Sequence, residues 1–169
     1  MDKINDRQTR GAVFVSAHTH LRNGDIESAI AVYSDGLKTF PNDEGIMSDL
    51  AISLAFIGGS EQISRAVALC ERVLADNQGG KVHHTTRAAL CFIYMKAGEK
   101  EKAVAVARKL PHVFESREVI LPQIDKGLSA GEIDSYLKFF VTGEGGEQNI
   151  FSRCAEALGF LCNNNRLLP

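Results

Sequence analysis

Apolar positions along most of the chain recur at helical spacing, and three short stretches repeat the same apolar pattern. The stretches AIAVY, AVALC and AVAVA begin at Ala29, Ala66 and Ala103, so the interval is 37 residues both times. Three matches at one interval indicate an internal repeat. Around each match the apolar residues follow the 3.6-residue period of a helix with one buried face. The pattern therefore predicts a series of similar helical units.

Glycines mark the turns that separate the two helices of each unit. Gly24 and Gly98 each lie five residues before a repeated alanine. Glycine readily ends a helix because it adopts the left-handed conformation at low cost, and the polar residues after it begin the next helix. The middle unit has a longer turn at Gly58 and Gly59, after which Ser60 is expected to cap the second helix. Each unit is therefore predicted to be a helical hairpin.

The repeated alanines are predicted to lie where the two helices of a hairpin cross. Two helices joined by a tight turn approach closely, and a large side chain at the crossing would force them apart. The first helices also carry a small residue seven positions before each turn glycine, namely Ala17, Ala51 and Cys91. We expect small residues to face small residues at all three crossings.

The chain after residue 111 loses the repeat but keeps helical patterns. SREVILPQI predicts a short helix that is capped by Ser116 and kinked or ended by Pro122. SAGEIDSYLKFFV opens with a capping box formed by Ser129 and Glu132. The apolar face of this second helix is expected to contain Ile133, Leu137, Phe140 and Val141.

The end of the chain combines a glycine-rich segment with another helical pattern. GEGGEQ, residues 143–148, predicts a flexible hinge, and NIFSRCAEALGFLCNNN predicts a last amphipathic helix. Two roles for the tail are open. It caps the last repeat, because a stack of repeats otherwise ends in an open apolar edge. Alternatively, it is an arm that docks in a groove of its own chain or of a neighbouring chain.

The composition is that of a globular protein and argues against two kinds of partner. Of the 169 residues, 44% are hydrophobic and 24% are charged, and the formal net charge is −2. This charge, without any basic run, argues against direct binding of nucleic acid. No apolar stretch approaches the roughly 18 residues of a membrane span, and the start, MDKINDRQTR, is too polar for a secretory signal. The four cysteines form no C-x-x-C pair, so we expect buried free thiols in a reducing cytoplasm.

No motif in the chain predicts a cofactor, a metal ion or catalysis. His18 and His20 are two positions apart on a helix, so they point to different faces and cannot share an ion. His83 and His84 stand at a helix start, where polar residues are common. TGEGGEQN lacks the Lys and Ser/Thr of a phosphate-binding loop, and no G-x-S-x-G turn is present. We therefore expect no metal, no cofactor and no enzymatic activity.

The repeat resembles the tetratricopeptide repeat (TPR), a family of helix-turn-helix units of about 34 residues. The matching residues are Ala17, Gly24, Ala29, Tyr33, Gly36 and Pro41 in the first unit, Leu50, Ala51, Gly58 and Ala66 in the second, and Leu90, Cys91, Tyr94, Gly98 and Ala103 in the third. The resemblance covers residues 10–111 and implies an all-α, TPR-like solenoid of about three helical hairpins with extra C-terminal helices. We accordingly expect hairpins over residues 1–111 and capping helices over residues 112–169, in one compact domain.

The chain also resembles the C-terminal helical-repeat region of bacterial Xre-type helix-turn-helix transcription regulators. This resemblance rests on LRNGDIESAIAVYSDGLKTFPND, AVALCERVL, AGEKEKAVAVARKLP and SREVIL. In those regulators a small DNA-binding domain precedes the repeats. Here the first repeat begins near residue 10, which leaves no room for a DNA-reading domain of about 60 residues. We expect either a stand-alone relative or the sensor half of a regulator.

The tetratricopeptide resemblance implies that the first helix of each hairpin lines a groove. Carried over by register, the groove residues are Phe14, His18, Leu21, Arg22, Ile52, Phe56, Phe92, Met95 and Lys96. The family's clamp for a C-terminal carboxylate uses Lys, Asn and Arg, and it is disfavoured here by Phe14, Ser48, Ile52, Ala88 and Phe92. The stripe is mainly apolar, and an apolar stripe of this size rarely faces water.

Three explanations of the apolar stripe are open. The tail helices cover it, its residues belong to the core, or an amphipathic helix of a partner docks on it. In the third case Phe56, Phe92 and Met95 are the anchors of the site. Arg22 and Lys96 then lie at its rim.

The sequence as a whole predicts a non-catalytic protein- or peptide-binding module with a regulatory or sensing role in a bacterial cytoplasm. The expected partner is an amphipathic helix, and no direct contact with nucleic acid or with a membrane is expected. One alternative is a homodimerisation or scaffold unit whose groove is filled by a second copy. The other is the sensor half of a transcription regulator that lacks its DNA-binding domain.

Overall fold

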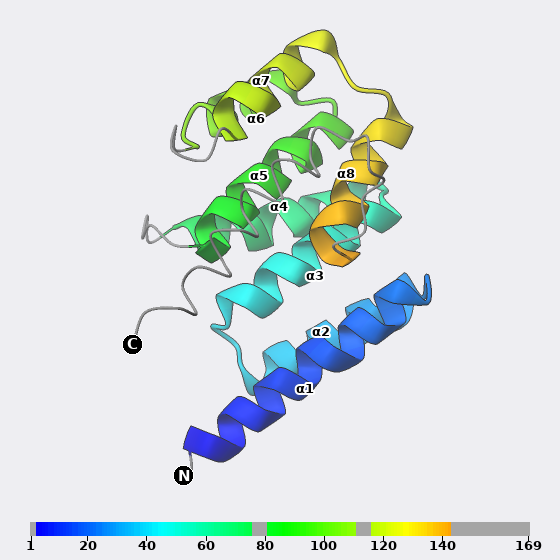
Figure 1. The fold of residues 1–169 in the computed structure, drawn as a ribbon, viewed down its shortest axis with the longest axis vertical. Coiled ribbons are helices and arrows are strands. Elements are labelled where there is room, and N and C mark those ends of the chain that lie inside the picture. Colours follow the sequence, from blue (N-terminus) through cyan, green and yellow to red (C-terminus); the bar gives the residue numbers. More distant parts are fainter. Residues whose placement is uncertain (1–2, 76–80, 111–115, 143–169) are drawn as a thin grey trace.

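The computed structural model of the protein describes residues 3–75, 81–110 and 116–142, and every regular element in these ranges is an α-helix. The helices are α1 Lys3–Arg22, α2 Ile26–Thr39, α3 Glu44–Ile57, α4 Ser60–Leu74, α5 Lys81–Lys96, α6 Lys100–Ala107, α7 Ser116–Lys126 and α8 Ala130–Thr142 (Figure 1). The all-α class expected from the sequence is thus confirmed. Within these ranges, no helix combines the length and the hydropathy that crossing a bilayer requires.

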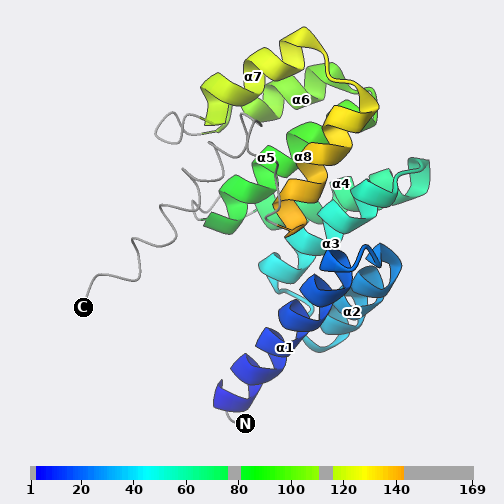
Figure 2. The same cartoon turned by 45° about the vertical axis from the view of Figure 1, so that its right-hand side comes forward.

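Helices that follow one another in the chain pack as pairs. Helix α1 packs on α2, α3 on α4 and α5 on α6, and the pairs contact each other through α2 with α3 and through α4 with α5. The pairs lie one above the other along the long axis, with α7 beside α6 (Figure 1). Helix α8 turns back across the pairs and packs on α3, α5 and α1 (Figure 2). The first helices of all three pairs therefore share one neighbour, α8.

The turns inside the pairs depend on glycines in the left-handed conformation. Gly24, Gly58 and Gly98 have φ values of 78°, 81° and 76°, and these are the positions where the sequence predicts that a helix ends. Gly59 also has a positive φ, and it is the N-cap of α4. The expectation that Ser60 caps α4 is therefore wrong: the second left-handed glycine starts the helix earlier, and Ser60 is its first residue.

The small residues of the repeat are buried as predicted. Ala17, Ala51 and Cys91 on the first helices and Ala29, Ala66 and Ala103 on the second helices all have 0% of their surface exposed. The paired helices that carry them contact each other in every case. Since a methyl or thiol group occupies little space, small residues in these positions allow the helix axes to lie close together.

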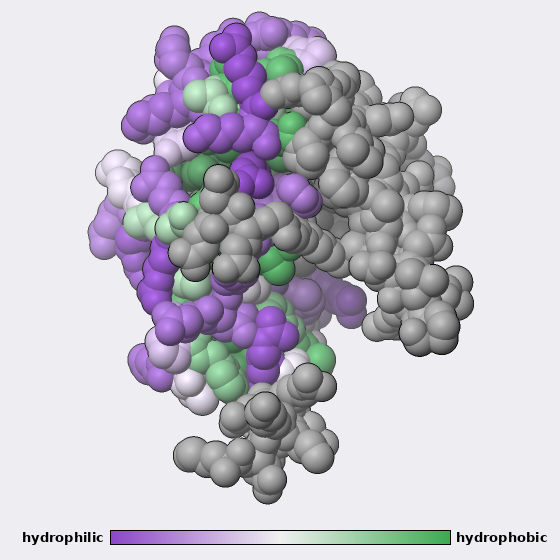
Figure 3. Space-filling view, turned by 90° about the vertical axis from the view of Figure 1, so that its left-hand side faces the viewer, coloured by the Kyte–Doolittle hydropathy of each residue, from purple (hydrophilic) through white to green (hydrophobic). Residues whose placement is uncertain are grey.

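The core runs without a break from α1 to α8. Its largest fully buried side chains include Tyr33, Ile46, Ile52, Leu54, Phe92 and Leu137. On the face shown in Figure 3, the described surface is mostly hydrophilic, with smaller hydrophobic areas between the polar side chains. The apolar faces of the helices are thus largely turned toward one another.

Pro122 lies inside α7, so of the two expectations for it, a kink or an end of the helix, the end is wrong. A proline removes one backbone hydrogen bond and crowds the preceding turn. In α7 it follows only six helical residues, so the lost bond lies in the first turns of the helix. Ile120 and Ile124 are buried on either side of it, whereas Pro122 itself is exposed. Burial of these two isoleucines holds the helix together across the proline.

Helix α8 begins with the predicted capping box. The Glu132 carboxylate accepts hydrogen bonds from the Ser129 backbone N–H at 2.8 Å and from the Ser129 hydroxyl at 2.7 Å. Ile133 and Leu137 are buried and Phe140 is half-buried, as expected for the apolar face. The side chain of Val141, the predicted hinge at residues 143–148 and the predicted last helix lie outside the described residues.

Candidate functional site

The nine residues predicted to line a groove lie on α1, α3 and α5, the three helices that α8 contacts. Three of them are core residues, namely Leu21 (6% exposed), Ile52 (0%) and Phe92 (0%). Five are half-buried, namely Phe14, His18, Phe56, Met95 and Lys96, and Arg22 is exposed. The stripe therefore does not lie bare: part of it belongs to the core, and α8 covers part of it.

The centre of the stripe is an aromatic cluster between α5 and α8. The Phe92 ring lies 4.7 Å from the Tyr136 ring and 6.1 Å from the Phe140 ring, measured between centroids. Aromatic pairs at these separations stabilise a contact beyond the area that they bury. Phe92 was predicted as an anchor for a helix, and the helix that it contacts is α8.

A polar contact flanks this cluster on the neighbouring turn of α5. The Lys96 ammonium lies 2.5 Å from a carboxylate oxygen of Asp134 on α8, and it donates a hydrogen bond to the Phe56 carbonyl oxygen at 3.0 Å. It also lies 6.0 Å from the centroid of the Phe56 ring. We call Phe56, Phe92 and Lys96 the α8 seat. It combines an apolar surface from α3 and α5 with one cation at its edge.

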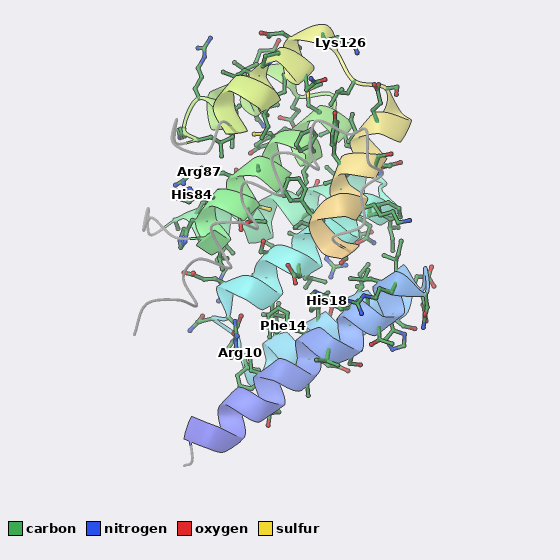
Figure 4. All side chains as sticks on the ribbon, viewed as in Figure 1. Arg10, Phe14, His18, His84, Arg87 and Lys126 are labelled. Carbon is green, nitrogen blue, oxygen red and sulfur yellow. The ribbon has the colours of Figure 1, made fainter. Side chains whose placement is uncertain are left out.

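The opposite end of the stripe joins α1 to α3 through a second set of residues, of which Arg10, Phe14 and His18 are labelled in Figure 4. The Arg10 guanidinium pairs with the Asp43 carboxylate and lies 4.9 Å from the centroid of the Phe14 ring. Asp43 also caps α3, because it accepts a hydrogen bond from the Ile46 backbone N–H at 3.0 Å. A Cβ on Gly45 would come within 3.1 Å of the Phe14 ring, so a larger residue here would require this ring to shift by a few tenths of an ångström.

Beside the contact between Arg10 and Asp43, the Asp49 carboxylate of α3 contacts side chains of both α1 and α2. Asp49 accepts a hydrogen bond from the Tyr33 hydroxyl of α2 at 3.2 Å, and His18 Nε2 of α1 lies 3.3 Å from the same oxygen. Burial and the Asp49 carboxylate raise the pKa of Tyr33 far above its ordinary value, so the hydroxyl stays protonated and donates. We call Arg10, Phe14, His18, Asp43 and Asp49 the α1–α3 end. Its polar side chains form hydrogen bonds and ion pairs that connect α1, α2 and α3.

We expect Asp43→Ala to lower the free energy of unfolding by about 1–2 kcal/mol, because it removes the side-chain cap of α3. The Arg10 ion pair, which is partly exposed, adds at most about 1 kcal/mol to this loss. Asp43→Asn keeps an acceptor for the Ile46 N–H, so it should cost less than Asp43→Ala. Urea titration of the three proteins checks the order, and equal losses for both variants would contradict the capping role.

The stabilisation by Asp43 should also depend on pH. Burial disfavours its charged form, but hydrogen bonds from Arg10 and from the Ile46 N–H outweigh burial, so the pKa of Asp43 lies below its ordinary value of 3.8. Because the folded-state pKa is the lower one, the contribution is complete above about pH 4 and is lost as the pH falls through the folded-state pKa. The stability difference between the wild type and Asp43→Asn should therefore shrink at acidic pH. A difference that stays constant down to about pH 2 would contradict this.

Sequence reasoning missed several residues of these contacts, and some of them had a usable signal. Arg10 lies four residues before Phe14 and eight before His18, which places all three on one face of α1. Asp43 stands directly before the helical pattern of α3, a typical N-cap position. Asp134 had no such signal, because its partner Lys96 is 38 residues away.

A separate hollow lies between α4, α5 and α6. Its volume is about 310 Å³, and it is lined by Glu71, Leu74, Arg87, Leu90, Tyr94, Lys102, Ala105, Val106 and Lys109. The Tyr94 hydroxyl donates to the Glu71 carboxylate at 2.9 Å, and the Lys102 ammonium lies 5.5 Å from the Tyr94 ring centroid. None of the nine predicted residues lines this hollow, so it is not part of the stripe.

The two described cysteines are free and buried, as predicted. Burial raises the pKa of both thiols, that of Cys91 to about 12, so they are protonated at neutral pH and poor nucleophiles. Cys154 and Cys162 lie outside the described residues.

The histidines form separate contacts, and one of them is buried. His18 contacts Asp49, whereas His20 contacts Asp25 at 3.2 Å, so the two point to different faces as expected. His83 lies at the start of α5, as expected, but it is only 4% exposed, and its Nε2 lies 3.8 Å from a Glu44 carboxylate oxygen. Among the residues that the structure covers, no three His, Cys, Asp or Glu side chains are placed to hold a metal ion.

Comparison with known proteins identifies no relative. No protein-family model matches the chain, and neither a curated protein nor a solved structure matches it. A function is therefore inferred from the geometry of the α8 seat and of the α1–α3 end.

Proposed function

We propose that the protein is a non-catalytic protein- or peptide-binding module that presents α1, α3 and α5 to an amphipathic helix. The observation that carries this proposal is that these three helices already hold a helix, α8, on the stripe that the sequence analysis singled out. A surface that packs an amphipathic helix through aromatic anchors and one rim cation has the chemistry of a helix-in-groove site.

The assignment as a TPR-like solenoid belongs to the same proposal. It is supported by three successive helix pairs, by the left-handed glycines at their turns and by the completely buried alanines at equal spacing. In such an array the first helices of the pairs line one side, and the second helices line the other. Of the six helices in the three pairs, only the first helices α1, α3 and α5 pack extensively on α8.

The non-catalytic role is supported by the state of the reactive side chains. The thiols of Cys70 and Cys91 are buried and protonated. The polar groups of the α1–α3 end bind each other across helices instead of converging on an open cavity. Such contacts hold a surface in shape, which is what recognition of a partner requires.

We expect helical peptides selected for binding to the full chain to contact the first helices. The probe is a library of amphipathic 14-residue peptides, and the site is mapped with a photo-crosslinking analogue of phenylalanine in place of Phe56 on α3. Phe56 is half-buried and is an aromatic residue, so an aromatic analogue is a mild change. Selected peptides should crosslink at this position and should compete with one another.

The matched control carries the same crosslinker in place of Ala105, an exposed residue of α6. Crosslinking in equal yield at both positions, or failure to select any peptide, would contradict the proposal. Sedimentation of the full chain separates it from the scaffold alternative. A dimer that strengthens with concentration and excludes the selected peptides would show that a second copy fills the site.

A further inference from the structure

We propose that α8 is an exchangeable ligand held in cis, and that a partner helix must carry the α8 pattern to displace it. This inference rests on the proposed function and names the partner's chemistry. The partner is an amphipathic helix with apolar or aromatic residues at the spacing of Ile133, Tyr136, Leu137 and Phe140 and a carboxylate at the position of Asp134. It competes with α8 for Phe92 and Lys96.

The apolar contact of α8 has the arrangement of a docked helix. Ile133, Tyr136, Leu137 and Phe140 stand at positions i, i+3, i+4 and i+7, the spacing of a single helical stripe. The first three are buried, and Tyr136 and Phe140 place their rings against Phe92. A helix that binds through four residues on one of its faces is recognised by the spacing of those four residues.

The positive charge of Lys96 at the edge of the α8 seat determines the second feature of the partner helix, an acidic residue. The Lys96 side chain is only 18% exposed, and its ammonium is held in place by the Phe56 carbonyl oxygen. The carboxylate that it meets at 2.5 Å belongs to α8. The pair is partly buried, with the Asp134 side chain 40% exposed, so a helix that brings an acid to Lys96 is favoured over one that does not.

The attachment of α8 allows it to leave as a unit. Its N-terminal cap is internal, because Ser129 and Glu132 cap each other, so the helix keeps its cap when it moves. Gly127, with φ at 79°, lies in the segment that joins α8 to α7, and an added Cβ there would meet nothing within 4 Å. The buried alanines that join the hairpins all lie on α1 to α6. Departure of α8 therefore leaves the hairpin contacts in place.

The tether also explains why displacement needs a matched partner. A segment joined by a short linker acts at an effective concentration of the order of millimolar, so α8 outcompetes weak ligands. A free peptide with the sequence of residues 129–142 should bind the wild-type chain poorly for this reason. Weakening α8 in cis should open the seat to the same peptide.

The test measures binding of a fluorescent peptide with the sequence of residues 129–142 to the full chain. Asp134→Lys in the chain places a cation against Lys96, and we expect this chain to bind the peptide about ten-fold more tightly than the wild type. A peptide that itself carries Asp134→Lys should bind the same chain about ten-fold more weakly than the unchanged peptide. The control chain, Ser135→Lys, introduces the same lysine side chain at an exposed position of α8, with a net charge change of +1 instead of +2, and should bind like the wild type.

A second measurement uses the unaltered chain and does not depend on any variant folding. Hydrogen exchange should show amides of residues 133–140 opening while amides of α3 and α5 stay protected, as a locally detaching helix requires. The inference is overturned if α8 exchanges only with global unfolding, or if the Asp134→Lys chain binds the peptide no better than the Ser135→Lys chain. It is also overturned if the Asp134→Lys chain exchanges α8 with a second copy and excludes the peptide. In the first two cases, selected peptides that crosslink at position 56 would still leave the proposed function standing.

Discussion

Phe92→Ala is expected to lower the free energy of unfolding by about 3–5 kcal/mol, the range for truncating a fully buried phenylalanine. Phe92 is 0% exposed, and its ring contacts the rings of Tyr136 and Phe140 on α8. Removal of the ring leaves a cavity between α5 and α8 that the surrounding helices fill only in part. The loss therefore combines burial, cavity and ring contacts at one position.

Urea unfolding followed by circular dichroism measures this loss for the full chain. Phe40→Ala is a suitable control, because Phe40 is only half-buried at the end of α2 and should cost clearly less. Phe92→Leu keeps most of the volume and should recover much of the stability. If Phe92→Ala costs no more than Phe40→Ala, Phe92 is not the centre of the contact between α5 and α8.

Ala66→Leu should disrupt the packing of its hairpin and should cost about 1–3 kcal/mol. Ala66 has no exposed surface and lies on α4, which packs on its pair partner, α3. Three additional carbon atoms at this position have no space, so the helices must separate or the side chain must adopt a strained rotamer. Ala29→Leu and Ala103→Leu should behave alike, because both alanines are equally buried.

The matched control is Ala68→Leu, which makes the same change two residues along α4 at an exposed position. Leucine and alanine both favour helix, so this variant should stay within about 0.5 kcal/mol of the wild type. Urea unfolding checks both variants, provided that the slope of the unfolding free energy against urea concentration is unchanged. Equal stability of the Ala66→Leu and Ala68→Leu proteins would mean that the repeated alanines do not mark the helix crossings.

Most of the fold was predictable because its signals are local. The left-handed glycines at positions 24, 58 and 98 and the capping box at Ser129 each act through neighbours within a few residues. Packing outweighs a local rule at two positions. Pro122 continues α7 because Ile120 and Ile124 are buried on both sides of it. Similarly, His83 enters the core in spite of its polarity.

The candidate site was predictable only in part. The register of the repeat identified Phe92 and Lys96 as neighbours on one helix face, and both contact α8. The same register could not distinguish an open groove from a covered one, because the helix that covers it comes from beyond the repeat. Asp49 was not foreseen at all, since its contacts with His18 and Tyr33 join three helices.

The sequence by itself determined where helices start, where glycines turn the chain and which small residues must be buried, because the 3.6-residue period and the φ preference of glycine operate at short range. Only the tertiary structure decided that α8 lies across α3 and α5, that Asp134 meets Lys96 and that Ile52 is completely enclosed. These contacts join segments that are far apart in the chain. Their formation depends on how all the helices pack together, and an amphipathic pattern states that a face is buried without stating which partner buries it.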